Sequence, residues 1–90
     1  MIPDLVSIEE TIDLHCHPYP DLFPRITDDQ GLAERARSLR MRAVVIKCHF
    51  ESTVGRAYNV SQQFEDIDVY GGIVLNQHSG GINPATVETS

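Results

Sequence analysis

The sequence predicts an α/β fold in which three parallel strands alternate with three covering helices, as in part of a TIM-type (β/α) barrel. Short apolar runs alternate with helix-like stretches in the order β-α-β-α-β-α, which is typical of parallel sheets with right-handed crossovers. About 30 residues separate equivalent positions of successive runs, roughly one βα unit of an eight-stranded barrel of about 250 residues. We therefore expect residues 1–90 to form a single partial domain, the N-terminal portion of a (β/α)8 barrel.

The first half of the chain contains one predicted strand and one predicted helix. Residues 11–17 are typical of a strand, and three prolines make residues 18–26 a loop. Thr27 followed by Gln30 has the form of a capping box. Residues 32–41 carry an apolar stripe at helical spacing, so we expect a helix that Thr27 caps.

The second half repeats this order. The apolar centre of residues 42–49 is continuous rather than alternating, which favours a strand buried on both faces. Ser52 or Thr53 could cap a second helix over residues 54–64. Residues 67–75 form the third predicted strand, interrupted by two glycines that indicate a bulge or a close backbone approach.

A third helix is expected to begin at Asn83 and Pro84, which have the residue types of an N-cap and a first helical position. The sequence stops at Ser90, within two turns of that start. Three parallel strands alone would leave both sheet edges open, which proteins usually avoid. We therefore expect the sequence to be incomplete, and the 90-residue chain to be inactive by itself.

Composition and charge argue against several classes of protein, among them nucleic-acid-binding, secreted and membrane-spanning proteins. The formal net charge is −6 at pH 7, which argues against nucleic acid or an anionic membrane as the main partner. The N-terminus lacks the pattern of a signal peptide, and no apolar run approaches the roughly 20 residues that span a bilayer. Two cysteines indicate no disulfide framework. We expect a cytoplasmic protein acting on a small-molecule substrate, and its oligomeric state stays open.

The three predicted strands end in the same pattern, which is an apolar residue, a polar residue, any residue and then histidine. These ends read LHCH, IKCH and LNQH, and they hold all 4 histidines of the chain. Side chains two residues apart on a strand share a face. In a barrel, inward-facing residues at the carboxyl ends of strands form the active site. The polar side chains of this pattern should therefore converge.

His15 and His17 are the predicted metal ligands. Imidazole is a good ligand for zinc, iron or nickel, and two histidines at i and i+2 on a strand can hold one ion from one side. Zinc is favoured, and iron, manganese and nickel are the other candidates. His49 and His78 are either further metal ligands or substrate contacts, and the pattern does not choose between these roles.

Other polar residues near the strand ends also have candidate roles. Lys47, Asn76 and Arg25 are candidate substrate-binding residues. Lys47 could instead be a bridging metal ligand if carboxylated, or a structural ion-pair partner, and Arg25 could be solvated. Asp13 shares the predicted face of His15. It could accept a hydrogen bond that orients a metal ligand, or be an ordinary hydrogen-bonded carboxylate.

Two features have plainer interpretations. Cys16 and Cys48 alternate with the histidines, so they should point toward the helices and pack as small apolar groups. Gly80 and Gly81 precede the expected helix start at Asn83 and could offer backbone N–H groups to an anion. A simple turn is the better interpretation of a double glycine.

Residues 12–17 resemble the amidohydrolase superfamily, whose members carry a His-x-His pair at the end of the first barrel strand. Together with the segments 45–49 and 75–84, in that order, they resemble a group of poorly characterised amidohydrolase-like proteins of unknown function. The likeness extends over residues 12–87.

This resemblance implies a metal-dependent hydrolase with one or two divalent metals, in which a metal-bound water attacks an amide, ester or related bond. His15 and His17 match the first metal-binding motif of that superfamily, whose later ligands and aspartate base come from strands beyond Ser90. Lys47 does not match its carboxylated lysine, which lies on a later strand. The alternatives are a polymerase-and-histidinol-phosphatase-type phosphoesterase, an inactive fragment, or an anion-binding α/β module.

Overall fold

The computed structural model describes residues 7–90. Its regular elements follow the predicted order, with a short 3₁₀ helix added after the third strand. They are β1 (Ile12–Cys16), α1 (Asp29–Ser38), β2 (Ala43–Ile46), α2 (Val54–Ser61), β3 (Asp68–Tyr70), η1 (Gln77–Ser79) and α3 (Pro84–Thr89). The prediction of three strands alternating with helices is confirmed.

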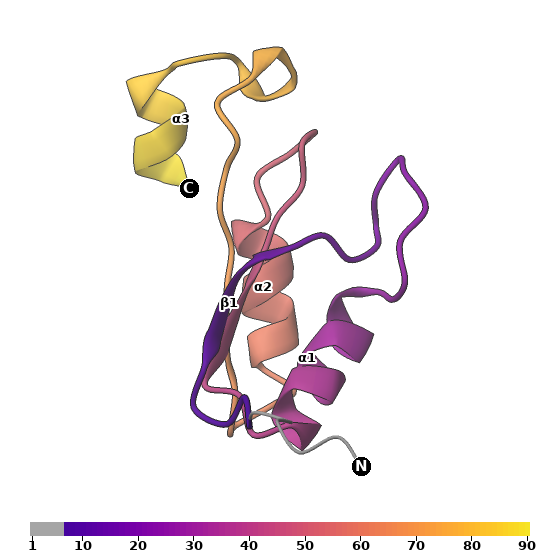
Figure 1. Cartoon of the computed structure of the whole chain (residues 1–90). Coiled ribbons are helices and arrows are strands. Elements are labelled where there is room, and N and C mark those ends of the chain that lie inside the picture. The colour runs from indigo at the N-terminus through magenta and orange to yellow at the C-terminus, as the bar shows by residue number, and fades with distance from the viewer. Residues whose placement is uncertain (1–6) are drawn as a thin grey trace.

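The three strands form a parallel sheet in the order β1-β2-β3. The helices α1 and α2 lie side by side along this sheet (Figure 1). The pairing of β1 with β2 contains an irregularity between Asp13 and Cys16, where β1 has one residue more than its partner. Within residues 7–90 the sheet is open, with β1 and β3 at its edges, so this part of the chain does not close a barrel.

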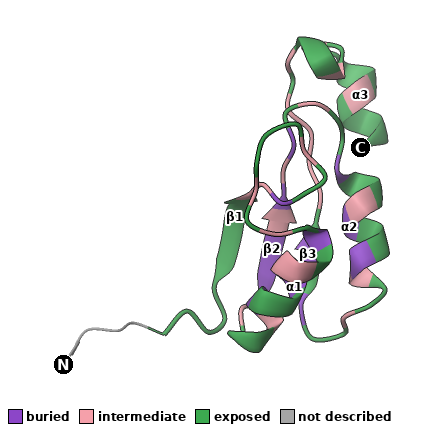
Figure 2. Ribbon diagram, turned by 90° about the vertical axis from the view of Figure 1, so that its right-hand side faces the viewer, coloured by how far each residue is buried: buried purple, intermediate pink, exposed green. Residues whose placement is uncertain are grey.

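Small and β-branched side chains fill the space between the sheet and the two helices. Figure 2 shows the buried positions on β2 and on the helices beside it, whereas β1 is mostly exposed. Ala43, Val44 and Ile46 of β2 are all buried, in agreement with the prediction for this strand. The buried cluster consists of Ala33, Ala36, Val44, Ile46, Ala57, Val60, Ile67 and Val69.

The start of α1 differs from the predicted capping box. The N-cap is Asp28, whose carboxylate accepts a hydrogen bond from the Gly31 N–H at 2.7 Å. The prediction of Thr27 as the cap, with Gln30 reaching back, was wrong by one residue. Thr27 lies outside the helix because its carbonyl accepts the Tyr19 N–H at 2.8 Å across the preceding loop.

Thr53 is the N-cap residue of α2, as expected, but its side chain does not cap the helix. The hydroxyl is fully buried and donates to the Ile46 carbonyl at 2.6 Å, while it accepts the Gly72 N–H at 2.8 Å. It therefore joins the end of β2 to the segment after β3. The helix ends at Ser61, short of the predicted residue 64.

β3 is much shorter than the predicted run 67–75, because its pairing with β2 stops at Tyr70. Gly71 then passes so close to the start of α2 that a Cβ atom there would lie 2.5 Å from the Val54 Cα. Gly71 thus marks a close backbone approach, one of the two alternatives expected from the sequence, whereas a Cβ atom at Gly72 would have nothing within 4 Å.

The chain ends in α3, which begins as predicted. The Asn83 side chain accepts the Ala85 N–H at 3.0 Å, and Pro84 occupies the first turn. None of the residues of α3 is buried, and the helix stands away from the sheet (Figure 1). Over residues 7–90, no helix has the length and apolar character needed to cross a membrane.

Candidate functional site

The four histidines lie in segments that follow the carboxyl ends of the three strands. His15 is in β1 and His17 directly follows it, His49 is in the loop between β2 and α2, and His78 is in η1. These loops leave the same end of the sheet (Figure 1). The structure therefore brings the four histidines to the carboxyl end of the sheet.

His15 and His17 face each other through their ring nitrogens. Their Nε2 atoms are 3.1 Å apart, and the ring planes are inclined by 50°. Such a separation requires a shared proton or a shared cation. Zinc–nitrogen bonds of about 2.0–2.1 Å in tetrahedral or octahedral geometry place two nitrogen ligands roughly 3–3.4 Å apart. The two histidines therefore fit one divalent ion.

His49 and His78 continue the array of rings outward from this pair. His49 stacks on His17 with ring centroids 4.8 Å apart and planes inclined by 21°. The Phe50 ring packs edge-on against two histidine rings. Its centroid lies 6.2 Å from that of His49 and 4.9 Å from that of His78. The sequence pattern does not single out Phe50, although this residue directly follows His49.

This array does not form a complete metal site. Among the residues that the structure describes, no three His, Cys, Asp or Glu side chains converge closely enough to hold an ion. Stacking places the faces of His49 and His17 against each other, so their nitrogens do not aim at one point. The His15–His17 pair can supply two ligands, and roles for His49 and His78 as metal ligands stay predictions.

The surroundings of His17 favour its neutral form. Burial lowers its pKa below the ordinary value of 6.5, and the nearby Arg25 guanidinium lowers it further. Neutral imidazole is the form that binds metals. Its Nδ1 atom is buried and has no hydrogen-bond partner in the described part of the chain.

The Asp13 side chain forms a hydrogen bond with the backbone of β1. Its Oδ1 atom accepts the backbone N–H of His15 at 3.0 Å. The carboxylate also lies beside the Cys16 thiol, where it helps to raise the pKa of that group. Asp13 therefore fixes the chain at His15, while the predicted contact to a histidine ring is not among its hydrogen bonds.

The two cysteines pack as predicted. Cys48 is buried, and Cys16 packs against the core cluster. Burial, followed by the neighbouring Asp13 carboxylate, raises the pKa of Cys16 to about 12.

We expect Cys16 to react very slowly with iodoacetamide at pH 8 in the folded chain, because only about one thiol in ten thousand would be ionised at that pH. Peptide mapping by mass spectrometry after timed alkylation measures this rate. The urea-unfolded chain, in which Cys16 should react at the ordinary rate, is the control. Equal rates in the folded and unfolded chains would contradict the prediction.

Lys47 and Asn76 take part in connections between the strand ends. The Lys47 backbone N–H donates to the Cys16 carbonyl at 2.7 Å. The Asn76 side chain donates to the His49 carbonyl at 2.7 Å and accepts the Ser79 N–H at 3.2 Å. Asn76 thus joins the loops after β2 and β3, and substrate binding by either residue stays a prediction.

Arg25 lies in the loop between β1 and α1 and is not fully solvated. Its guanidinium donates to Asp21 at 3.1 Å, and the Asp21 side chain is buried. The same group lies 5.8 Å from the ring centroid of Phe23. Arg25 is also close enough to His17 to affect its pKa.

An ion pair that no sequence pattern reveals fixes the backbone just after His17. Arg56 binds both carboxylate oxygens of Asp29, at 2.8 and 2.7 Å, and also donates to the Pro18 carbonyl at 3.2 Å. It therefore links α2 to the start of α1 and to the residue after His17. The two partners lie far apart in the sequence, and no local pattern pairs them.

Comparisons with known proteins place this chain in a family without naming an activity. No curated protein and no solved structure gave a match. A family model with the description "Family of unknown function (DUF6282)" matches residues 10–90, the region that carries all of the site described above. Because the match covers nearly the whole chain, the protein belongs to the DUF6282 family.

Proposed function

We propose that this protein is a metal-dependent hydrolase of the amidohydrolase type, in which His15 and His17 bind a divalent metal, with zinc favoured. The observation that carries the proposal is the 3.1 Å separation of the two Nε2 atoms at the carboxyl end of β1. Enzymes with parallel (β/α) barrels have their active sites at this end of the strands. Three parallel strands followed by helices are also what consecutive units of such a barrel would look like.

The chain's own residues have the properties that this chemistry needs. When bound, a divalent ion supplies a water of lowered pKa and polarises the oxygen of the scissile bond. Asp13 holds the backbone of His15, and the lowered pKa of His17 favours its neutral imidazole. We propose that His49 and Lys47, which follow the neighbouring strand, contact a small substrate bearing an amide, ester or related bond.

Zinc binding tests the metal part of this proposal. We expect His15→Gln and His17→Gln each to weaken zinc binding by at least about tenfold, since each removes a ligand. Calorimetric titration of the purified chain, with cobalt(II) absorption as a second readout, measures this effect. His78→Gln tests the further predicted ligand separately from the pair, because His78 lies beyond Phe50. Unchanged zinc affinity in both His15→Gln and His17→Gln would refute the assignment.

Hydrolysis tests the reaction. In the natural protein, His15→Ala and His17→Ala should remove both bound metal and zinc-dependent cleavage of amide or ester probes. Full activity with unchanged metal content in either variant would contradict the mechanism. Cleavage restricted to phosphoesters would favour the polymerase-and-histidinol-phosphatase type of activity. The anion-binding alternative has less support, because Asn83 itself occupies the Ala85 N–H at the start of α3.

A further inference from the structure

Arg56 contacts the two loops that carry the stacked histidines. Its Nη2 atom donates a hydrogen bond to the Pro18 carbonyl at 3.2 Å, and its Nη1 atom donates to the Glu51 carboxylate at 3.1 Å. Pro18 directly follows His17, and Glu51 lies two residues after His49. Arg56 itself lies in the first turn of α2. One guanidinium group therefore joins the loop after β1 to the loop after β2.

Asp29 fixes the position of this guanidinium group. Its carboxylate accepts hydrogen bonds from Nε and Nη2 of Arg56 at 2.8 and 2.7 Å, and the two side chains are largely buried. The backbone N–H of Asp29 also donates to the Tyr19 carbonyl at 3.0 Å. A planar guanidinium presents its donors in a rigid fork, so several acceptors hold it in one orientation. The start of α1 thus anchors Arg56 and the loop after β1 together.

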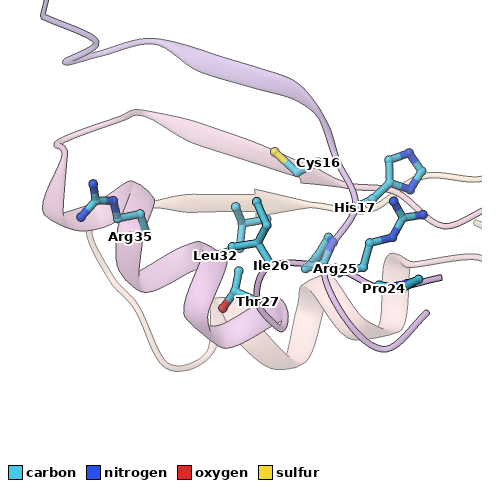
Figure 3. A pocket seen from close by; sticks show the side chains of 9 residues that line it. Cys16, His17, Pro24, Arg25, Ile26, Thr27, Leu32 and Arg35 are labelled. Carbon is cyan, nitrogen blue, oxygen red and sulfur yellow. The ribbon is translucent and has the colours of Figure 1, made fainter. Parts of the chain in front are cut away.

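His17 depends on such contacts for its orientation. Figure 3 shows His17 at one end of a pocket of about 620 Å³ that lies between the end of β1, the following loop and α1. The ring faces His15 with Nε2 atoms 3.1 Å apart, and it stacks on His49 with centroids 4.8 Å apart. Because the pocket side is open, the ring is held by these two histidines and by the backbone at Pro18.

We propose that Arg56 is a positioning residue for the histidine site. It holds Pro18 and Glu51 at a fixed separation. The loops that follow β1 and β2 then keep the arrangement that stacks His49 on His17. The stack in turn keeps Nε2 of His17 directed at its partner in the metal-binding pair. The stack itself needs no metal, whereas the effect on zinc affinity rests on the proposed function.

Positioning and stability make different predictions for zinc. A ligand that is fixed before the metal arrives loses less conformational freedom on binding. Groups that contact and orient a metal ligand typically change metal affinity by about 10–100-fold. Arg56 acts through the backbone and a neighbouring loop, so we expect a smaller effect of about fivefold. A role in stability alone predicts equal zinc affinity among variants that fold.

The first test follows the stack in the metal-free chain by NMR. We expect Arg56→Lys to weaken the NOEs between the carbon-bound ring protons of His17 and His49 by at least about threefold, scaled to NOEs within the core. Lysine keeps the positive charge beside Asp29, but one ammonium group cannot replace the fork of donors. Arg40→Lys is the matched control, because Arg40 is mostly exposed. Equal NOEs in both variants would overturn the proposal.

Glu51→Ala tests the second contact without touching the buried pair. Glu51 is 51% exposed, so its replacement leaves folding intact and removes only the bond between Arg56 and the loop of His49. The same NOEs should weaken about twofold, less than in Arg56→Lys because exposed ion pairs are weak. Glu65→Ala makes the same substitution at an exposed residue between α2 and β3 and should leave them unchanged. Equal NOEs in Glu51→Ala and Glu65→Ala would also refute the role of Arg56, even where Arg56→Lys does not fold.

Zinc titration separates this proposal from the proposed function. Arg56→Lys should weaken zinc binding about fivefold. Ile67→Val removes one buried methyl group at the amino end of β3, the opposite end of the sheet, and should leave zinc affinity unchanged. If zinc binding does not depend on His15 and His17, the metal centre fails and the NOEs still decide the role of Arg56. If His15→Gln weakens zinc binding and Arg56→Lys does not, the positioning role alone is refuted.

Discussion

Replacing Arg56 with methionine is expected to lower the free energy of unfolding by about 2–4 kcal/mol. The substitution leaves the Asp29 carboxylate without its two hydrogen bonds and frees the Pro18 carbonyl. Breaking one side of a buried ion pair costs about 3–5 kcal/mol. The side chains of Arg56 and Asp29 are still 14% and 12% exposed, so water offsets part of that cost.

Urea denaturation followed by circular dichroism measures this change. Arg40→Met is the matched control, because Arg40 meets Glu9 only at 3.9 Å and both side chains are mostly exposed. Surface pairs of this kind contribute about 0–1 kcal/mol. The double variant Asp29→Leu/Arg56→Met should be more stable than Arg56→Met alone, since no unpaired carboxylate remains. A loss of stability in Arg56→Met no larger than in Arg40→Met would contradict the prediction.

Replacing Gly71 with alanine is expected to cost about 3 kcal/mol of stability, at the upper end of what overpacking usually costs. The new Cβ would lie 2.5 Å from the Val54 Cα and 2.6 Å from the Thr53 carbonyl carbon and oxygen. These are backbone atoms that cannot turn aside. The start of α2 and the end of β3 would have to separate, which would disturb the buried hydrogen bonds of Thr53 with Gly72 and Ile46.

The adjacent Gly72→Ala variant is the control for this prediction. A Cβ atom at Gly72 would have nothing within 4 Å, and both variants add the same methyl group one residue apart. We expect Gly72→Ala to lie within about 0.5 kcal/mol of the parent chain, as is usual away from special contacts. Thermal and urea unfolding of the two variants give the comparison. Equal stabilities would show that the close approach at Gly71 does not constrain the fold.

The pairing of His15 with His17 could be predicted from the sequence, whereas the surroundings of the pair could not. His15 and His17 follow a strand at i and i+2, so the strand period alone places them on one side of the chain. The stacking of His49 on His17 depends on how two loops meet, and no local pattern encodes that. The link between the two loops depends on partners of Arg56 that lie up to 38 residues away in the sequence. The metal, the reaction and the closed barrel stay predictions.

The sequence by itself determined the order of strands and helices, the parallel sheet, the burial of β2 and the start of α3. These features follow from short-range periodicity and from proline and asparagine at a helix start, which act within a few residues. Only the tertiary structure decided that Asp28 rather than Thr27 caps α1 and that β3 stops at Tyr70. It also decided that the Thr53 hydroxyl forms hydrogen bonds with Ile46 and Gly72. In each case a hydrogen bond or a close backbone approach from a distant segment outweighed the local preference, because a buried polar group must find a partner wherever the fold offers one.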